Sequence, residues 1–368
     1  MLIYYSIFVV MIMAFLAIEK KYFENIYYLA IFLIFVYFPV IVGLNSDRVD
    51  YINYVDHFNQ LPRLFTLSYF SSLLKATGAI ELGYAFFASV VKTFSNSATV
   101  FFVILCFLSF YFRFRFVKYF ACHKEDILLI FFAFFAHEFL RKDAIQIRNG
   151  IASAIVLFSF ISLYRGYRTR FVIWVLFASL FHVAAFVSIP LVVLNAHLDT
   201  KTLRNMRCIF LIALLSVFVF SIMDFLLFLK NFGFLPSRLI LYMQWDYFNN
   251  PLSIYHPTVL RQITICFVFL FILHKHINAS NPVAVFLFKI YLVSTLYYIV
   301  FLDFAILSGR FGSLFSGVET VFFLQVINTN LVRRKVLFKI GVLSIAMMTF
   351  IVNLVMMPRY LGFEATFQ

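Results

Sequence analysis

Charge is scarce in this sequence: 12% of its 368 residues are charged and 64% are hydrophobic. Soluble domains are usually about 25% charged and about 45–50% apolar. A chain with so little polar surface could not cover itself in water. The mean hydropathy is +0.97, and several apolar runs approach the roughly 20 residues that a bilayer core requires. The composition therefore excludes a soluble protein and indicates one that crosses a membrane several times.

Cysteine and short catalytic motifs are equally sparse. The four cysteines are scattered, with no CxxC motif and no nearby histidine pair at ligand spacing, so we expect neither a zinc site nor a disulfide framework. No HExxH, P-loop, GxSxG or DxD motif occurs. Metalloprotease, nucleotide-hydrolysing, serine-hydrolase and simple metal-nucleotide glycosyltransferase functions therefore lack their motifs. The sequence predicts no metal and no cofactor.

Acidic residues are outnumbered, since 30 lysines and arginines face 16 aspartates and glutamates and leave a net charge of +14. In a membrane protein such an excess belongs largely to cytoplasmic loops, so we expect no nucleic-acid partner. Four basic clusters are expected in the cytoplasm: Lys20 and Lys21; Arg113, Arg115, Lys118 and Lys124; Arg165, Arg168 and Arg170; and Arg333, Arg334, Lys335 and Lys339. The loops at 45–81 and 230–257 then lie on the external face, which in a bacterium is the periplasm.

The apolar runs predict an all-α fold, a polytopic transmembrane helical bundle. They lie at about 2–18, 26–44, 98–112, 126–140, 150–164, 171–194, 208–229, 258–273, 282–302, 311–331 and 336–357. With a shorter stretch at 82–94 they give about 10–12 spans. The runs lack the alternation of barrel strands, and helices satisfy their own backbone groups in lipid. Because no soluble segment is long enough to stand apart, we expect residues 1–368 to form a single integral membrane domain.

Two segments conflict with simple alternation across the membrane. The runs 82–94 and 98–112 both lie between the first external loop and a cytoplasmic basic cluster, so we expect one of them to be re-entrant or interfacial. Basic residues also follow the run 171–194, where a single crossing would lead outside. We expect this run to be a bent or re-entrant pair of half-helices around His182 or Pro190.

The first external loop opens with a polar group. Asp47, Asp50, Tyr51 and Tyr54 follow one another at intervals that place them on one face of a helix. Carboxylates and aromatic rings in this arrangement suit the binding of sugar hydroxyls. The alternative is a helix N-cap followed by interfacial tyrosines.

A second polar group lies at 138–148. Asp143 and Gln146 have the spacing of a capping box, which predicts a helix that begins there and runs through residue 164. Arg141, Lys142 and Arg148 would place cations beside the positive end of that helix, which favours an anion site. The alternative is that these are snorkelling side chains, although cations on an external face run against the positive-inside bias.

Four further ionisable residues are candidates. His182 lies in the middle of an apolar run, where it is either a proton acceptor or a hydrogen-bonded structural histidine. Glu81 precedes an apolar stretch and is either a helix-start carboxylate or a substrate contact. Arg238 and Arg310 are external cations of the kind that bind phosphate bidentately, with Asp303 a candidate counter-ion of Arg310.

Several of these residues stand in short motifs. The motifs are Asp47-x-x-Asp50-Tyr51-x-x-Tyr54, Glu81-x-Gly83-Tyr84, Arg148-Asn149-Gly150-Ile151-Ala152 and Ala178-x-x-x-His182. Their order and spacing over about residues 1–195 resemble those of the EpsG-type, Wzy-like polysaccharide polymerases of bacterial inner membranes. Beyond that region the resemblance rests on hydropathy, Arg238 and Arg310.

The resemblance implies a polymerase of O-antigen or capsule repeat units, with the fold of a multi-span, GT-C-like, lipid-carrier-dependent glycosyltransferase. Such an enzyme transfers a glycan from undecaprenyl diphosphate to another undecaprenyl-diphosphate-linked repeat unit on the periplasmic side. Arg148 would bind the donor diphosphate, and Asp47, Asp50 and Glu81 would bind or deprotonate the acceptor, with His182 as the alternative base. The remaining candidates are substrate contacts: Arg141, Lys142, Arg238, Arg310, Tyr51, Tyr54 and Tyr84.

Other functions share this polar inventory. A flippase or transporter of lipid-linked glycans would also use a basic cavity and external aromatic loops. A transferase that adds a single group would keep the chain length, and a ligase would change the acceptor. The expected partners are the lipid-linked donor and acceptor, membrane lipids, and a chain-length regulator and flippase of the same pathway.

Overall fold

The structure is a computed structural model, and it describes residues 23–45, 50–66, 68–76, 81–139, 142–235, 237–244, 251–274, 281–329 and 335–356. Every element in these ranges is a helix, which confirms the all-α prediction. The chain forms two compact units, one of Met1–Val192 with Val332–Gln368 and one of Val193–Leu331.

The first unit carries three of the long apolar segments. Its helices are α2 (Phe23–Phe32), the π-helical η2 (Leu33–Tyr37), α3 (Phe38–Leu44), α4 (Tyr51–Gln60), α5 (Tyr69–Ala76), α6 (Leu82–Phe94), α7 (Ala98–Phe120), α8 (Lys124–Phe134), the π-helical η4 (Phe135–Phe139), α10 (Ile147–Tyr164), α11 (Arg168–Ser179), the 3₁₀-helical η5 (Val183–Val193) and α20 (Lys335–Met356). The expected external loop at 45–81 thus contains two helices, α4 and α5.

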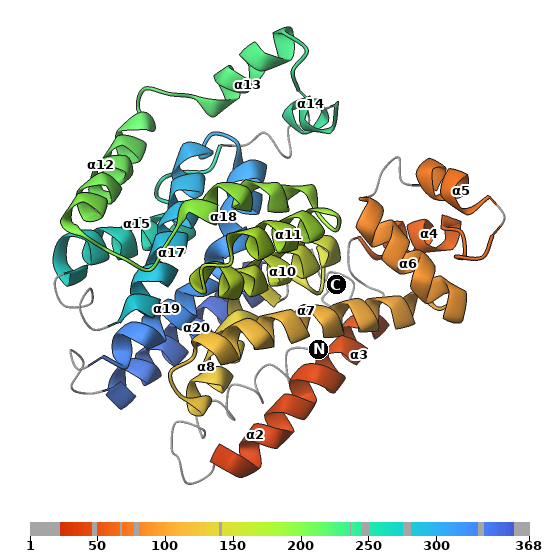
Figure 1. The fold of residues 1–368 in the computed structure, drawn as a ribbon, viewed down its shortest axis with the longest axis horizontal. Helices are drawn as coiled ribbons and strands as arrows, with labels where there is room; N and C mark the ends of the chain where they lie inside the picture. The colour runs from red at the N-terminus through yellow and green to blue at the C-terminus, as the bar shows by residue number, and fades with distance from the viewer. Residues whose placement is uncertain are drawn as a thin grey trace. The chain divides into compact units, whose positions relative to one another are not determined.

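Helices α7, α10 and α11 pack side by side at the centre of this unit (Figure 1). Large rings fill their interface: Trp174 of α11 lies edge-on to Phe158 of α10, with 5.0 Å between ring centroids, and Phe112 of α7 contacts both. Aromatic pairs of this geometry stabilise a contact beyond what the burial of apolar surface alone provides. These rings therefore stabilise the packing of the three helices.

Helices α7 and α10 run in the same direction along this interface. Arg113 of α7 donates hydrogen bonds to the first turns of α10. The ring centroid of Phe120, at the end of α7, lies 5.5 Å from that of Tyr164, at the end of α10. Helix α11 returns antiparallel. The N-termini of α7 and α10 and the C-terminus of α11 therefore share one end of the unit.

The second unit contains α12 (Thr200–Ser216), α13 (Ile222–Asn231), α14 (Ser237–Gln244), α15 (Pro257–Val268), the π-helical η6 (Phe269–Leu273), α17 (Pro282–Val300), α18 (Ala305–Ser316) and α19 (Val318–Ile327). Most of α17 is buried. Phe288 of α17 stacks on Phe269, with centroids 3.6 Å apart, and Tyr291 stacks on Phe322 of α19. The apolar helix α17 is therefore the core of this unit.

Four helical stretches among the described residues are long and apolar enough to cross a membrane: Ile26–Leu44, Ala98–Phe120, Ile147–Tyr164 and Pro282–Val300. Shorter apolar helices occupy Leu82–Phe94, Val183–Val193, Pro257–Leu273 and Val318–Ile327. These segments confirm a polytopic helical membrane protein. The expected span at 2–18 lies outside the described residues.

The expected bend in the run 171–194 is present. Helix α11 ends at Ser179 and the 3₁₀-helix η5 begins at Val183, so the break falls at residues 180–182. The break ends at His182, one of the two positions that the sequence indicated. The backbone carbonyl of Leu180 lies within this break, and it organises the candidate site.

Candidate functional site

The site begins where the first turn of α6 docks against the end of α11. The backbone N–H groups of Gly83 and Tyr84 both donate to the carbonyl oxygen of Leu180, at 2.9 and 3.2 Å. A Cβ at position 83 would lie 2.5 Å from the Cβ of Leu180 and 2.8 Å from its carbonyl oxygen. Glycine is therefore required for the contact. This docking brings the residue before α6, Glu81, beside the last residue of the break, His182.

Glu81 bridges a guanidinium and an imidazole. Arg148 donates through Nη1 to Oε2 of Glu81 at 2.6 Å, and Nδ1 of His182 lies 3.2 Å from Oε1. The three residues come from three separate stretches of sequence, at the starts of α6 and α10 and at the break after α11. The Glu81 side chain is 10% exposed and that of His182 12%. The arrangement is a charge-assisted network with each carboxylate oxygen bonded to a different partner.

The carboxylate of Glu81 is ionised. Burial acts to raise its pKa, but the hydrogen bond from His182 and the positive charge of Arg148 outweigh burial and lower the pKa to about 2. An ionised carboxylate can accept hydrogen bonds and cannot donate them. Nδ1 of His182 therefore carries the proton and donates to Glu81. In the neutral ring this fixes the lone pair on Nε2, the atom that can accept a proton.

Two tyrosines form an aromatic wall beside Arg148. Its guanidinium carbon lies 5.6 Å from the ring centroid of Tyr54 and 6.0 Å from that of Tyr84, within the range of cation–π attraction. Both rings are buried, whereas the Arg148 side chain keeps 28% of its surface exposed. Arg148 is thus held by a carboxylate and two rings while part of its side chain stays exposed.

His57 is a residue of this site that is not among the predicted site residues. It lies one turn after Tyr54 on α4, and burial together with the charge of Arg148 lowers its pKa, while Asp56 opposes the shift. A lowered pKa keeps this half-buried imidazole neutral near pH 7. The i, i+3 spacing to Tyr54 is the sequence signal that could have identified it.

Five of the predicted site residues are brought together: Glu81, Arg148, His182, Tyr54 and Tyr84. Tyr51 shares the face of α4 that carries Tyr54, since both rings approach Phe102 of α7. Asp50 occupies the N-cap position of α4 without a side-chain capping bond. Asp47 and Arg141 lie outside the described residues.

The capping box predicted at Asp143 is wrong. Helix α10 begins at Ile147, its N-cap is Gln146, and the Gln146 side chain makes no capping bond. The carboxylate of Asp143 instead accepts hydrogen bonds from the hydroxyl of Ser109 and, at 3.1 Å, from Arg113. The reason is a tertiary contact: two polar side chains of α7 bind this carboxylate, so it does not cap α10.

Lys142 belongs to the same enclosed cluster. Its ammonium lies 3.0 Å from Oε2 of Glu138, and Arg113 lies 3.8 Å from the same oxygen. The side chains of Arg113 and Lys142 are each 3% exposed. The expected position of Arg113 in a cytoplasmic loop is therefore wrong. Lys142 has its charge compensated inside the protein by Glu138, and its role as a substrate contact stays a prediction.

The two remaining predicted cations belong to the second unit. Arg310 of α18 lies over the ring of Tyr242, 4.7 Å from its centroid, and Arg238 is in α14. The expected pairing of Asp303 with Arg310 is wrong. Among the described residues Asp303 forms no ion pair; it accepts hydrogen bonds from the Ser221 hydroxyl at 2.7 Å and the Met223 N–H at 3.0 Å, at the start of α13.

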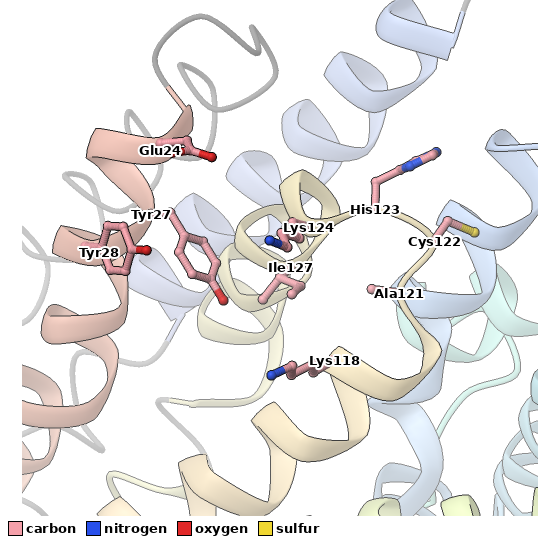
Figure 2. Close-up of a pocket in the computed structure, with 9 residues that line it drawn as sticks. All are labelled: Glu24, Tyr27, Tyr28, Lys118, Ala121, Cys122, His123, Lys124 and Ile127. Carbon is pink, nitrogen blue, oxygen red and sulfur yellow. The ribbon is translucent and has the colours of Figure 1, made fainter.

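A cavity of about 400 Å³ also opens in the first unit, and Figure 2 shows Tyr27, Lys118 and Lys124 directed toward it. Its lining residues come from α2, the C-terminal end of α7 and the start of α8. The C-terminal end of α7 is remote from Arg148, which lies in the first turn of α10. The cavity is therefore separate from the Glu81 network. In the described ranges no three histidine, cysteine or carboxylate side chains are grouped as a metal site would require.

Comparison with known proteins gives one result. The model of the EpsG family matches residues 25–364, nearly the whole chain. No curated protein and no solved structure matches the sequence. The match covers all four apolar stretches able to cross a membrane as well as Glu81, Arg148 and His182. This multi-pass membrane protein belongs to the EpsG family.

Proposed function

We propose that this protein polymerises undecaprenyl-diphosphate-linked oligosaccharide repeat units into O-antigen or capsular polysaccharide, by glycosyl transfer on the periplasmic side of the inner membrane. Membership of the EpsG family supports a polysaccharide-polymerase-like role. The observation that carries the proposal is the bridge from Glu81 to Arg148 and His182. It sets a partly exposed cation and an oriented base side by side, which are the two groups that this transfer requires.

The proposed step exchanges one glycosidic oxygen for another. A hydroxyl oxygen of the acceptor sugar bonds to the anomeric carbon of the donor glycan, and the bond from that carbon to the undecaprenyl diphosphate breaks. The diphosphate departs with the electron pair, and the hydroxyl proton passes to Nε2 of His182. Because the donor already carries a diphosphate leaving group, the step consumes no nucleotide sugar.

Arg148 is assigned to the leaving group. Negative charge grows on the diphosphate as the bond breaks, and a guanidinium already held in place stabilises it without reorganisation. One N–H of Arg148 is bonded to Glu81, the side chain is 28% exposed, and a guanidinium carries further N–H groups that can donate to phosphate oxygens. Arg141, Arg238 and Arg310 remain predicted supporting cations.

His182 is assigned as the base and Glu81 as its positioning residue. A carboxylate with a pKa of about 2 is a weak base near neutral pH, so proton transfer to Glu81 itself would be inefficient. The same carboxylate fixes the tautomer of His182 and holds Arg148. Tyr54 and Tyr84 are buried and support the site by holding Arg148 through cation–π contacts, while Asp47, Asp50 and Tyr51 remain predicted acceptor contacts.

The test is reconstitution of the purified protein in liposomes with its own undecaprenyl-diphosphate repeat unit and no nucleotide sugar. A ladder of longer lipid-linked glycans is expected from the unmodified protein and from Arg168→Ala, which removes an exposed cation elsewhere, and a far slower one from Arg148→Ala. Unchanged chain length with native substrate and folded protein would overturn the proposal. Relocation alone would indicate a flippase, and a changed mass per repeat would indicate transfer of a single group.

A further inference from the structure

The groove of interest lies at the end of α7, α10 and α11 opposite the Glu81 network. It has a volume of about 810 Å³ and is lined by the C-terminal parts of α7 and α10 and the N-terminal part of α11. Arg148 is in the first turn of α10, whereas Arg165 follows its last residue. The 18 residues of α10 span about 27 Å, which is close to the thickness of a bilayer core.

The charge of the groove has one sign. Arg115, Lys118, Arg165 and Arg170 line it, and none of its lining residues is acidic. In the described part of the chain, none of these four cations lies within 4.0 Å of a carboxylate. By contrast, the smaller cavity of Figure 2 shares Lys118 but also contains Glu24. The groove is therefore the site of uncompensated positive charge.

Aromatic rings hold the guanidinium groups at the groove. Arg165 lies 4.7 Å from the ring centroid of Tyr119 and donates to its hydroxyl at 3.2 Å. Arg170 lies 5.3 Å from the ring centroid of Tyr167. Since each contact occupies a ring face or one donor, the remaining N–H groups are available to an anion.

The groove also has an apolar wall. Trp174 is half-buried against Phe158, and Ile173 is 58% exposed on the same helix. Apolar exposure beside cations and aromatic rings is typical of a membrane interface, where acyl chains and phosphate groups meet. A free phosphate ion would leave this wall uncovered, whereas a lipid would cover it.

We propose that this groove binds the headgroup of an anionic phospholipid such as phosphatidylglycerol. The phosphate contacts Arg165, Arg170 and Arg115, and an acyl chain lies along Ile173 and Trp174. Basic pockets between membrane helices recognise lipid headgroups in this way. The site is remote from the Glu81 network and independent of the function proposed for it.

Trp174 provides a direct measurement. The chain contains two tryptophans, so Trp245→Phe leaves Trp174 as the only tryptophan when the full-length protein is reconstituted in liposomes. Brominated phosphatidylglycerol is expected to quench Trp174 more strongly than phosphatidylcholine brominated in the same chains. Arg165→Gln/Arg170→Gln should weaken the apparent affinity for phosphatidylglycerol on the order of fivefold for each arginine removed.

A matched control removes the same charge elsewhere. Arg168 and Lys201 are exposed and do not line the groove, so Arg168→Gln/Lys201→Gln should leave the quenching unchanged. Equal losses in the two double variants would overturn the proposal in favour of general surface charge. Equal quenching by the two lipids, or full competition by inorganic phosphate at matched concentration, would overturn a lipid site. Unchanged elution and Trp174 emission without brominated lipid confirm that each variant is folded.

Discussion

Two carboxylate–cation networks in the first unit use the same chemistry in different surroundings. In one, Glu81 binds Arg148, whose side chain is 28% exposed. In the other, Asp143 and Glu138 surround Arg113, whose side chain is 3% exposed. Arg113 also donates to the carbonyl of Gly150 and the hydroxyl of Ser153 on α10. Arg148 of the first network therefore stays partly accessible, whereas Arg113 of the second is buried and joins α7 to α10.

The difference shows why a charge inside a membrane bundle is not by itself a sign of catalysis. Buried ionisable side chains must be compensated, and both networks achieve this. What distinguishes them is whether the cation retains donors that a substrate could reach. By this criterion Arg148 is the arginine to which we assign the proposed function, and Arg113 connects the turn before α10 to α7.

The largest effect is expected from Arg113→Ala. Removing one partner of a buried ionic network leaves carboxylates uncompensated and costs about 3–5 kcal/mol of stability. The yield of monodisperse protein and the thermal unfolding midpoint should both fall. Arg115→Ala removes the same charge from an exposed position two residues away and should change neither. A stable Arg113→Ala variant that lacks polymerisation would break the distinction between the two networks.

Arg148→Ala should cost less stability than Arg113→Ala, because His182 still pairs with Glu81, and it should slow polymerisation. Loss of one preorganised donor to a developing negative charge typically costs about 10²–10³-fold in rate. Arg148→Lys keeps the charge but loses the planar fork, so it should recover part of the activity. Initial rates of ladder formation measure both variants, and an unchanged polymer length and yield for Arg148→Ala would remove the diphosphate assignment.

The pH dependence of stability should report Glu81. Its pKa is lowered from 4.5 to about 2 in the folded protein, so its ionised form stabilises the fold above about pH 4.5, and this stabilisation disappears as the pH falls toward 2. Linkage converts the shift into at most roughly 3 kcal/mol. The stability difference between unmodified protein and Glu81→Gln should therefore shrink on acidification. A difference independent of pH would contradict an ionised bridge.

Gly83→Ala should disturb the site through the backbone. The added Cβ would meet Leu180 at 2.5 Å, and overpacking of this kind typically costs about 1–3 kcal/mol. Since the same contact places Glu81 beside His182, activity should fall together with stability. Gly341→Ala is the matched control, because nothing lies within 4 Å of a Cβ at that position of α20. Equal behaviour of the two variants would show that the docking of α6 is dispensable.

Short-range patterns predicted the elements well and the contacts poorly. The stretch 82–94 coincides with α6, and the break near His182 was visible in the charges that flank it. The capping box at Asp143 was wrong because its actual partners, Ser109 and Arg113, lie 34 and 30 residues earlier in the chain. The same separation concealed the buried position of Arg113, which the sequence groups with exposed basic residues.

By itself the sequence determined that this is a helical membrane protein. Hydropathy along the chain is a local property, and the partition of each segment into a bilayer depends on it directly. The sequence motifs also singled out Glu81, Arg148 and His182, through their resemblance to a family. Only the tertiary structure decided that these residues form one network, since it depends on a carbonyl exposed at the break after α11 and a glycine that lets α6 approach it. Whether Arg113 or Arg148 remains accessible also depends on long-range packing, so the order of charges along the sequence cannot predict it.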